Sequence, residues 1–107
     1  MAEELNETVY VGHDNAIVLR LTEDGAPADL ADVTRMMVDL GPVEVDSAVS
    51  PALVAWAGDT VTLKLGTAPA LGGLGKSATA RLIVYTPENP NGIVWIERIR
   101  LRIVPQA

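Results

Sequence analysis

The segment ALGGLGKS, residues 70–77, is a stretch of this sequence whose spacing resembles a phosphate-binding loop. Its last three residues occupy the Gly-Lys-Ser positions of the Walker A pattern, with Lys76 as the phosphate-contacting cation. That chemistry needs a helix directly after the loop, because amides at a helix N-terminus hold the phosphates. The sequence that follows, TARLIVYT at 79–86, is instead typical of a β-strand. We therefore interpret the segment as a glycine-rich connection that binds no nucleotide.

Acidic residues and the single histidine gather in predicted turns of the first third of the chain. The acidic residues are Asp14, Glu23, Asp24, Asp29 and Asp32. Calcium binds clustered carboxylates, but this spacing matches no EF-hand or comparable loop, and turn-forming aspartates explain most of the set. His13 stands in the turn GHDN, which favours a loop histidine over a ligand or a base. Cysteine is absent, which excludes disulfides and thiolate zinc sites. We expect no metal site and no cofactor, with a weak calcium site as the alternative.

Three aromatic residues, Trp56, Tyr85 and Trp95, could build a flat platform for a sugar. The competing interpretation is that they supply bulk to a core that contains no phenylalanine. The core interpretation is favoured. A carbohydrate- or ligand-binding module that uses Trp56 or Trp95 stays open as the alternative function.

Charged residues at the two ends of the chain form the candidate interface. An acidic arm over residues 1–8 stands at one end, and an arginine on every second residue of the last predicted strand stands at the other. Pairing of the arginines within their own sheet and a nucleic-acid contact are alternatives, although nucleic acid calls for more positive charge and for interleaved aromatics. Arginine is also enriched at protein interfaces, so we expect the arm of one copy to dock on the arginines of a neighbour. The candidate interface residues are Glu3, Glu4, Glu7, Arg98, Arg100 and Arg102.

The bulk composition narrows the class of protein. The chain has 107 residues, 49% of them hydrophobic, and a net charge of −6. This length suits one domain, which we place at 9–107 behind the flexible arm 1–8. The negative charge argues against nucleic acid or an anionic membrane as partner, and the sequence has no apolar run long enough for a membrane span. The polar N-terminus is unlike a signal peptide.

Period-two hydrophobic alternation predicts the elements that must position these residues. Strands are expected at 9–11, 16–22, 33–40, 43–48, 53–57, 60–65, 79–86 and 93–104, with loops at 23–32, 66–77 and 86–92. About seven or eight short strands without a convincing helix predict an all-β sandwich or barrel. The core residues predicted by strand parity are Ile17, Leu19, Leu21, Val38, Val61, Leu63, Leu82, Val84, Ile99 and Leu101.

Several of these segments together resemble a known group of proteins. They are AIVLRLTEDGAPADLADVTRMMVDL at 16–40, TVTLKLG at 60–66 and ATARLIVYTPENPNGIVW at 78–95. This pattern is similar to that of small immunoglobulin-like β-sandwich proteins encoded among the tail and virion genes of tailed bacteriophages. It resembles in particular the N-terminal module of baseplate upper proteins.

The resemblance implies a single immunoglobulin-like antiparallel β-sandwich that is not an enzyme and has no catalytic residues. Its expected function is assembly of a phage particle, as a tail-tip, baseplate or fibre adaptor or as a decoration protein. The expected partners are other virion proteins and further copies of this chain in a symmetric array, with no nucleic acid and no membrane. The expected location is the virion, after synthesis in the host bacterial cytoplasm.

Overall fold

The protein is all-β, as the sequence predicts. The computed structural model describes residues 4–68 and 75–104, and for Glu4 only the backbone. These residues include ten strands and one 3₁₀ turn, η1 (Leu65–Thr67), and no helix among them could cross a membrane. The strands are β1 (Glu4–Tyr10), β2 (Ile17–Arg20), β3 (Thr22–Glu23), β4 (Ala26–Pro27), β5 (Arg35–Asp39), β6 (Glu44–Asp46), β7 (Val54–Ala57), β8 (Thr60–Leu63), β9 (Ser77–Thr86) and β10 (Asn89–Val104).

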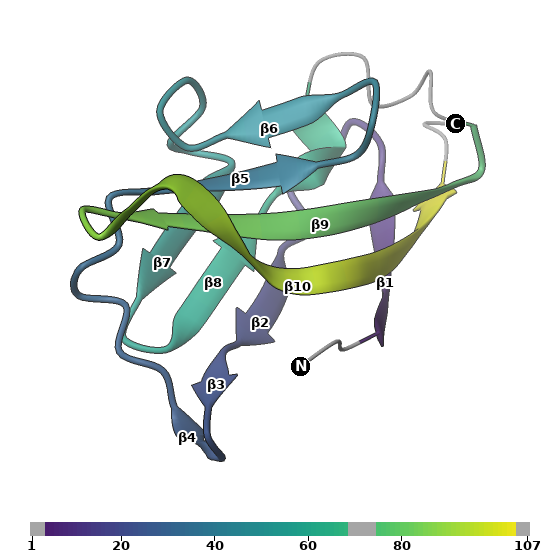
Figure 1. The fold of residues 1–107 in the computed structure, drawn as a ribbon. Coiled ribbons are helices and arrows are strands. Elements are labelled where there is room, and N and C mark those ends of the chain that lie inside the picture. The colour runs from purple at the N-terminus through teal and green to yellow at the C-terminus, as the bar shows by residue number, and fades with distance from the viewer. Residues whose placement is uncertain (1–3, 69–74, 105–107) are drawn as a thin grey trace.

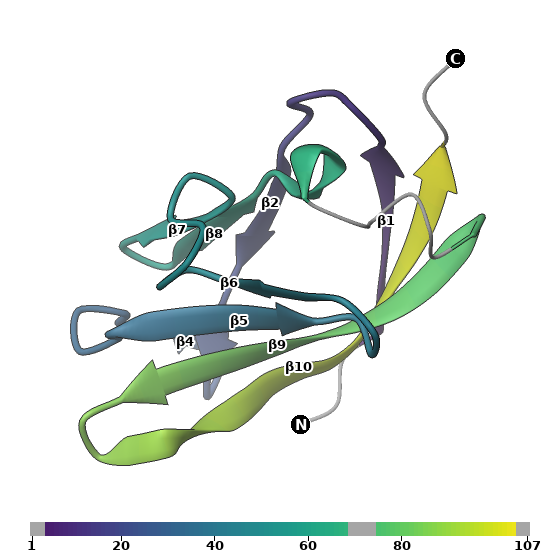
Figure 2. The same cartoon turned by 90° about the horizontal axis from the view of Figure 1, so that it is seen from above.

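Two sheets face each other across the core (Figures 1 and 2). One has the order β1-β10-β9-β5-β6 and the other the order β2-β8-β7, while β3 and β4 form a separate hairpin. In immunoglobulin sandwiches, strands C, F and G form one sheet and strands B, E and D lie side by side in the other. Here β5-β9-β10 and β2-β8-β7 follow those two orders.

The core is aliphatic and comes from both sheets. In β8, Val61 and Leu63 are buried and alternate with half-buried threonines, and β5 repeats the pattern with Met36 and Val38. Because side chains alternate across a strand, each strand sends one set of residues inward. All ten core residues predicted from strand parity are buried, which confirms the predicted register of these strands.

The N-terminal segment is a strand rather than a flexible arm, which corrects the expectation for residues 4–8. β1 runs parallel to β10, with Glu4 opposite Arg98 and Tyr10 opposite Val104. Val9 is buried in the core cluster and Leu5 packs against it, so this segment gains apolar contacts by pairing. The parallel pair also means that the larger sheet is mixed and not purely antiparallel. Residues 1–3 lie outside the described residues.

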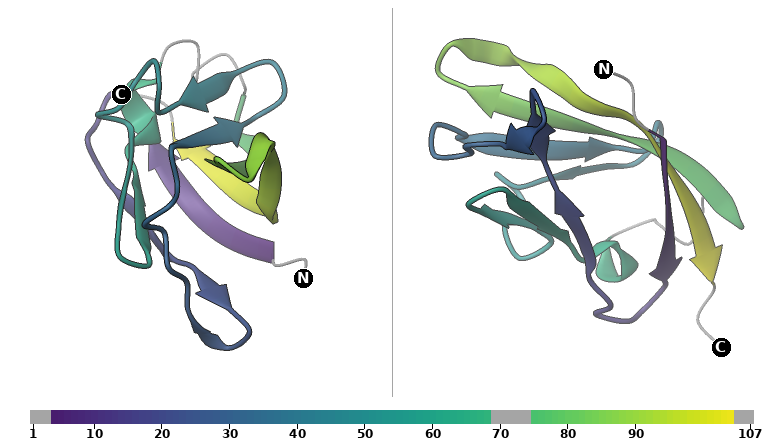
Figure 3. Two further views of the ribbon diagram at one scale, coloured as in Figure 1. Left: turned by 60° about the vertical axis from the view of Figure 1, so that its left-hand side comes forward. Right: turned by 90° about the horizontal axis from the view of Figure 1, so that it is seen from below.

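The predicted loop 23–32 contains a hairpin. Asp24 and Gly25 both have positive φ, 53° and 81°, which is the conformation of a type I′ turn. Two residue pairs, Thr22 with Pro27 and Glu23 with Ala26, close the hairpin. It projects from the body of the molecule (Figure 3).

β10 is longer than expected and irregular. It begins at Asn89, inside the predicted loop 86–92, but its pairing with β9 is interrupted between Asn89 and Ile93, where Pro90 has no amide to donate. Two further register shifts precede Ile99. The last of them leaves Glu97 and Arg98 both exposed, and strict alternation resumes from Ile99 onward.

Candidate interaction surface

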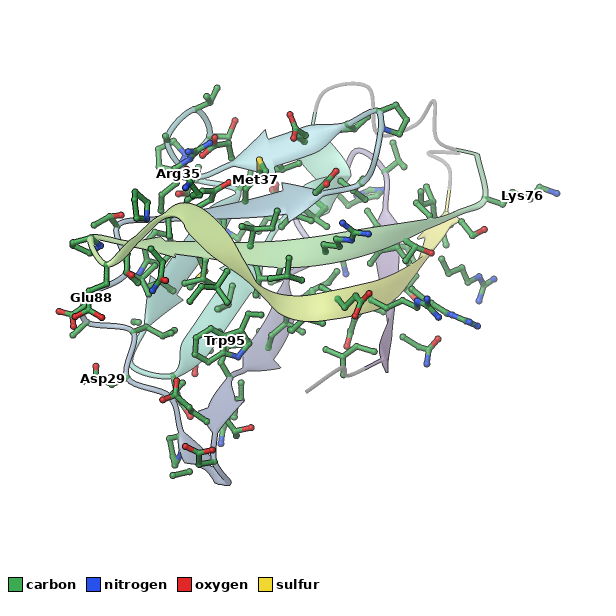
Figure 4. All side chains as sticks on the ribbon, viewed as in Figure 1. Asp29, Arg35, Met37, Lys76, Glu88 and Trp95 are labelled. Atoms are coloured by element: carbon green, nitrogen blue, oxygen red, sulfur yellow. The ribbon has the colours of Figure 1, made fainter. Side chains whose placement is uncertain are left out.

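The outer face of the five-stranded sheet carries an apolar row bordered by charge. Met37 of β5 lies opposite Ile83 of β9, which lies opposite Val94 of β10. Met37 and Ile83 are half-buried and Val94 is 48% exposed. Their neighbours along β5 and β9 point inward and are buried, so this row belongs to the outer face. Arg35 and Met37, both on β5, are neighbours on this face (Figure 4).

Arg35 is the centre of a polar cluster on this face. Its Nε donates to both carboxylate oxygens of Asp46, at 2.8 and 2.9 Å, and a terminal nitrogen donates to Oδ2 as well. The guanidinium carbon lies 4.4 Å from the centre of the Tyr85 ring, a distance typical of cation–π contacts. A planar guanidinium thus bridges β5, β6 and β9.

The electrostatics of this cluster follow from its geometry. The hydrogen bonds from Arg35 hold the pKa of Asp46 below its ordinary value, against an opposing effect of burial, and the Ala48 amide adds to the lowering. The hydrogen bond to Asp46 raises the pKa of Arg35. Arg35 and Asp46 are therefore both charged at neutral pH, and their pairing holds the guanidinium in one orientation.

Strand alternation places Arg35 on the face opposite to the predicted core residue Val38, but alternation alone does not pair Arg35 with Asp46. Met37 lies directly opposite Asp46, so Arg35, two residues earlier on the same face, reaches Asp46 diagonally. A hairpin that joins β5 and β6 with its turn at residues 41–42 fixes which residues lie opposite one another. That register would have revealed the pair, since long side chains reach diagonal neighbours on the same face.

The predicted arginine ladder does lie on the outer face of β10. Arg98, Arg100 and Arg102 are exposed, while Ile99 and Leu101 between them are buried. Arg98 and Arg100 have interactions within the chain. The ladder is therefore partly engaged within its own molecule.

The acidic half of the candidate interface is arranged differently from the expectation. β1 lies beside β10 of the same chain, where Glu4 is opposite Arg98. Glu7 is opposite the buried Leu101 and is itself half-buried, so it does not share the face of the arginines. Glu3 and the side chain of Glu4 lie outside the described residues. Residues 4–8 are therefore held in a strand of their own molecule and do not form a free arm, while a contact of these residues with a neighbouring copy stays a prediction.

The remaining candidates are placed as follows. Ser77 begins β9 directly after Lys76, so a strand stands where a phosphate-binding loop needs a helix; residues 70–74 of that segment lie outside the described residues. Within residues 4–68 and 75–104, no three His, Cys, Asp or Glu side chains gather as metal ligands. His13 is exposed, and Asp29 accepts a hydrogen bond from the Ala31 amide at 3.0 Å, as turn aspartates do.

The two tryptophans belong to different sheets. Trp56 is on β7 of the smaller sheet and Trp95 is on β10 of the larger one. Both are half-buried and pack against the core, which agrees with the core interpretation of these two residues. Tyr85 instead lies beside Arg35 on the outer face, so the core interpretation is wrong for Tyr85. In Figure 4, Trp95 lies below the ribbon of β10 and not on the outer face.

Comparison with known proteins identifies no relative: no family model, no curated protein and no solved structure matches this chain.

Proposed function

We propose that this chain is a non-enzymatic structural protein of a bacteriophage particle. It acts as a tail-tip, baseplate or fibre adaptor, or as a decoration protein, by contacts with other virion proteins and with copies of itself. The bacteriophage assignment rests on the sequence resemblance. The observation that carries the binding role is the outer face of the five-stranded sheet, where apolar, aromatic and arginine side chains are held on paired strands.

The composition of this face suits a protein contact. Aromatic residues, methionine and arginine are enriched at protein interfaces, and Tyr85, Met37 and Arg35 occupy neighbouring positions here. The contact of Arg35 with both Tyr85 and Asp46 fixes its planar group before a partner arrives, so less side-chain freedom is lost on binding. In a symmetric particle, repetition multiplies such contacts, so each can be individually weak.

The alternative, a sugar-binding module that uses Trp56 or Trp95, gains no support from the described residues. A platform needs aromatic faces that are open to solvent, whereas both tryptophans pack against the core from separate sheets.

Localisation of a tagged chain tests the proposal. A phage genome whose copy of the chain carries an epitope tag after residue 107 should yield particles that a tag antibody labels at one defined position in electron micrographs. Particles with an untagged chain are the control. A tag that stays in the soluble lysate fraction, with unlabelled particles, would contradict the proposal.

A further inference from the structure

The charges of this chain are segregated in space. Of its eight lysines and arginines, five lie on β9 and β10 or directly before β9. They are Lys76, Arg81, Arg98, Arg100 and Arg102. Conversely, residues 21–34, which include the β3–β4 hairpin, contain four acidic residues and no lysine or arginine.

The acidic element is exposed and well defined. Glu23 and Asp24 lie at the end of the β3–β4 hairpin, and Asp29 and Asp32 follow it; all four are exposed. The tight turn at Asp24 and Gly25 holds the first two carboxylates at the tip of a projecting hairpin (Figures 1 and 3).

The basic element, which we call the basic row, consists of Arg102 on β10, its neighbours Thr8 and Ser77 on β1 and β9, and Lys76 directly before β9. Across β1, β10 and β9, Thr8, Arg102 and Ser77 occupy neighbouring positions in register. Together with Arg100, these residues line a shallow hollow of about 340 Å³. Glu7 also borders the hollow, although its register position beside the buried Leu101 belongs to the inner face. Lys76 extends from the same end of the sheet (Figure 4). A guanidinium flanked by two hydroxyls suits a carboxylate, because all three groups can donate hydrogen bonds to it.

We propose that the β3–β4 hairpin of one copy docks on the basic row of a second copy. The two surfaces are complementary in charge and come from different parts of the molecule, so the contact is heterologous. Contacts of this kind build rings or open filaments, as multi-copy assembly requires. The proposal rests on the proposed function and specifies one of its contacts. A polyanion such as single-stranded DNA is the other occupant that a basic row could attract, but the net charge of −6 repels it.

Two variants separate the surfaces. The hairpin variant combines Glu23→Lys with Asp24→Asn, since asparagine tolerates the positive φ of residue 24. The row variant combines Arg102→Glu with Lys76→Gln. Matched controls make equal charge changes at exposed sites elsewhere: Glu88→Lys with Asp14→Asn, and Lys64→Glu with Arg20→Gln.

Sedimentation velocity of the purified chain gives the readout. We expect the wild type and both controls to associate at about 1 mM in about 20 mM salt and to dissociate in about 500 mM salt, where charges are screened. Each surface variant should associate at least about tenfold more weakly. An equal mixture of the two variants should form a dimer and nothing larger, since each supplies one intact surface.

A monomeric wild type, or a mixture of the two variants that stays monomeric, would overturn the inference. Equal losses in the matched controls would overturn it as well, because only net charge would then matter. Tight binding of a single-stranded DNA probe by a chain that does not self-associate would assign the row to the other occupant. In each of these cases, a chain still found in particles would leave the proposed function standing.

Discussion

Two valines of the smaller sheet provide a matched test of the strand register. Val61 of β8 is fully buried between Leu19 and Trp56, whereas Val18 of β2 is 58% exposed beside Thr62. Replacing a buried valine by alanine removes two carbons, worth about 1.6 kcal/mol of transfer free energy. With the cavity term, we expect Val61→Ala to lower the free energy of unfolding by about 2–3 kcal/mol.

The same change at Val18 should cost less. Because Val18 is 58% exposed, less than half of its surface is removed from water. The transfer free energy lost on replacement by alanine is therefore about 0.7 kcal/mol. For a domain of this size, about 4 °C of melting temperature accompanies each kcal/mol, so the expected shifts are about 8–12 °C for Val61→Ala and about 3 °C for Val18→Ala. Urea unfolding and thermal melts followed by circular dichroism measure both. Equal losses, or a larger loss at Val18, would mean that the strands of this sheet are shifted by one residue, so that the opposite set of side chains faces the core.

Three further outcomes are expected. Gly66→Ala should destabilise the domain, because a β-carbon there would collide with the carbonyl oxygen of Tyr10; a melting temperature equal to that of the wild type would refute this close approach. Asp46→Asn should destabilise more at pH 7 than at pH 3, because the lowered pKa of Asp46 contributes stability above its unfolded value and loses it as the pH falls through the folded value. An equal difference in urea unfolding at both pH values would show that charge pairing with Arg35 is not the cause. Deletion of residues 1–10 should lower the melting temperature and promote association, because it removes β1 and leaves an edge of β10 unpaired; a deletion that melts like the full chain would contradict the pairing of β1.

The sequence was sufficient to predict the inward-facing residues of strands in which apolar and polar residues alternate without interruption. Val61 and Leu63 in β8, and Ile99 and Leu101 in β10, lie on the apolar parity of their strands and are buried as predicted. Alternation is a local property, so it can be seen without knowledge of the partner strand.

Features that depend on the neighbouring strand of a sheet could not be predicted in this way. β1 has few apolar residues, and its placement depends on pairing with β10, which is distant in sequence. The Asp24-Gly25 turn was visible, but the flanking residues lack the alternation that marks a hairpin. The Arg35–Asp46 pair likewise depends on the register across a turn, and strand parity gives only the face of each residue.

The copy number of the chain in purified phage particles tests the central claim most directly. Quantitative mass spectrometry with isotope-labelled peptides of this chain should give the same whole number of copies in every preparation. That number should match the rotational symmetry of the part of the particle that contains the chain. Absence of the peptides, or trace amounts that vary with washing as host proteins do, would contradict a structural role in the virion.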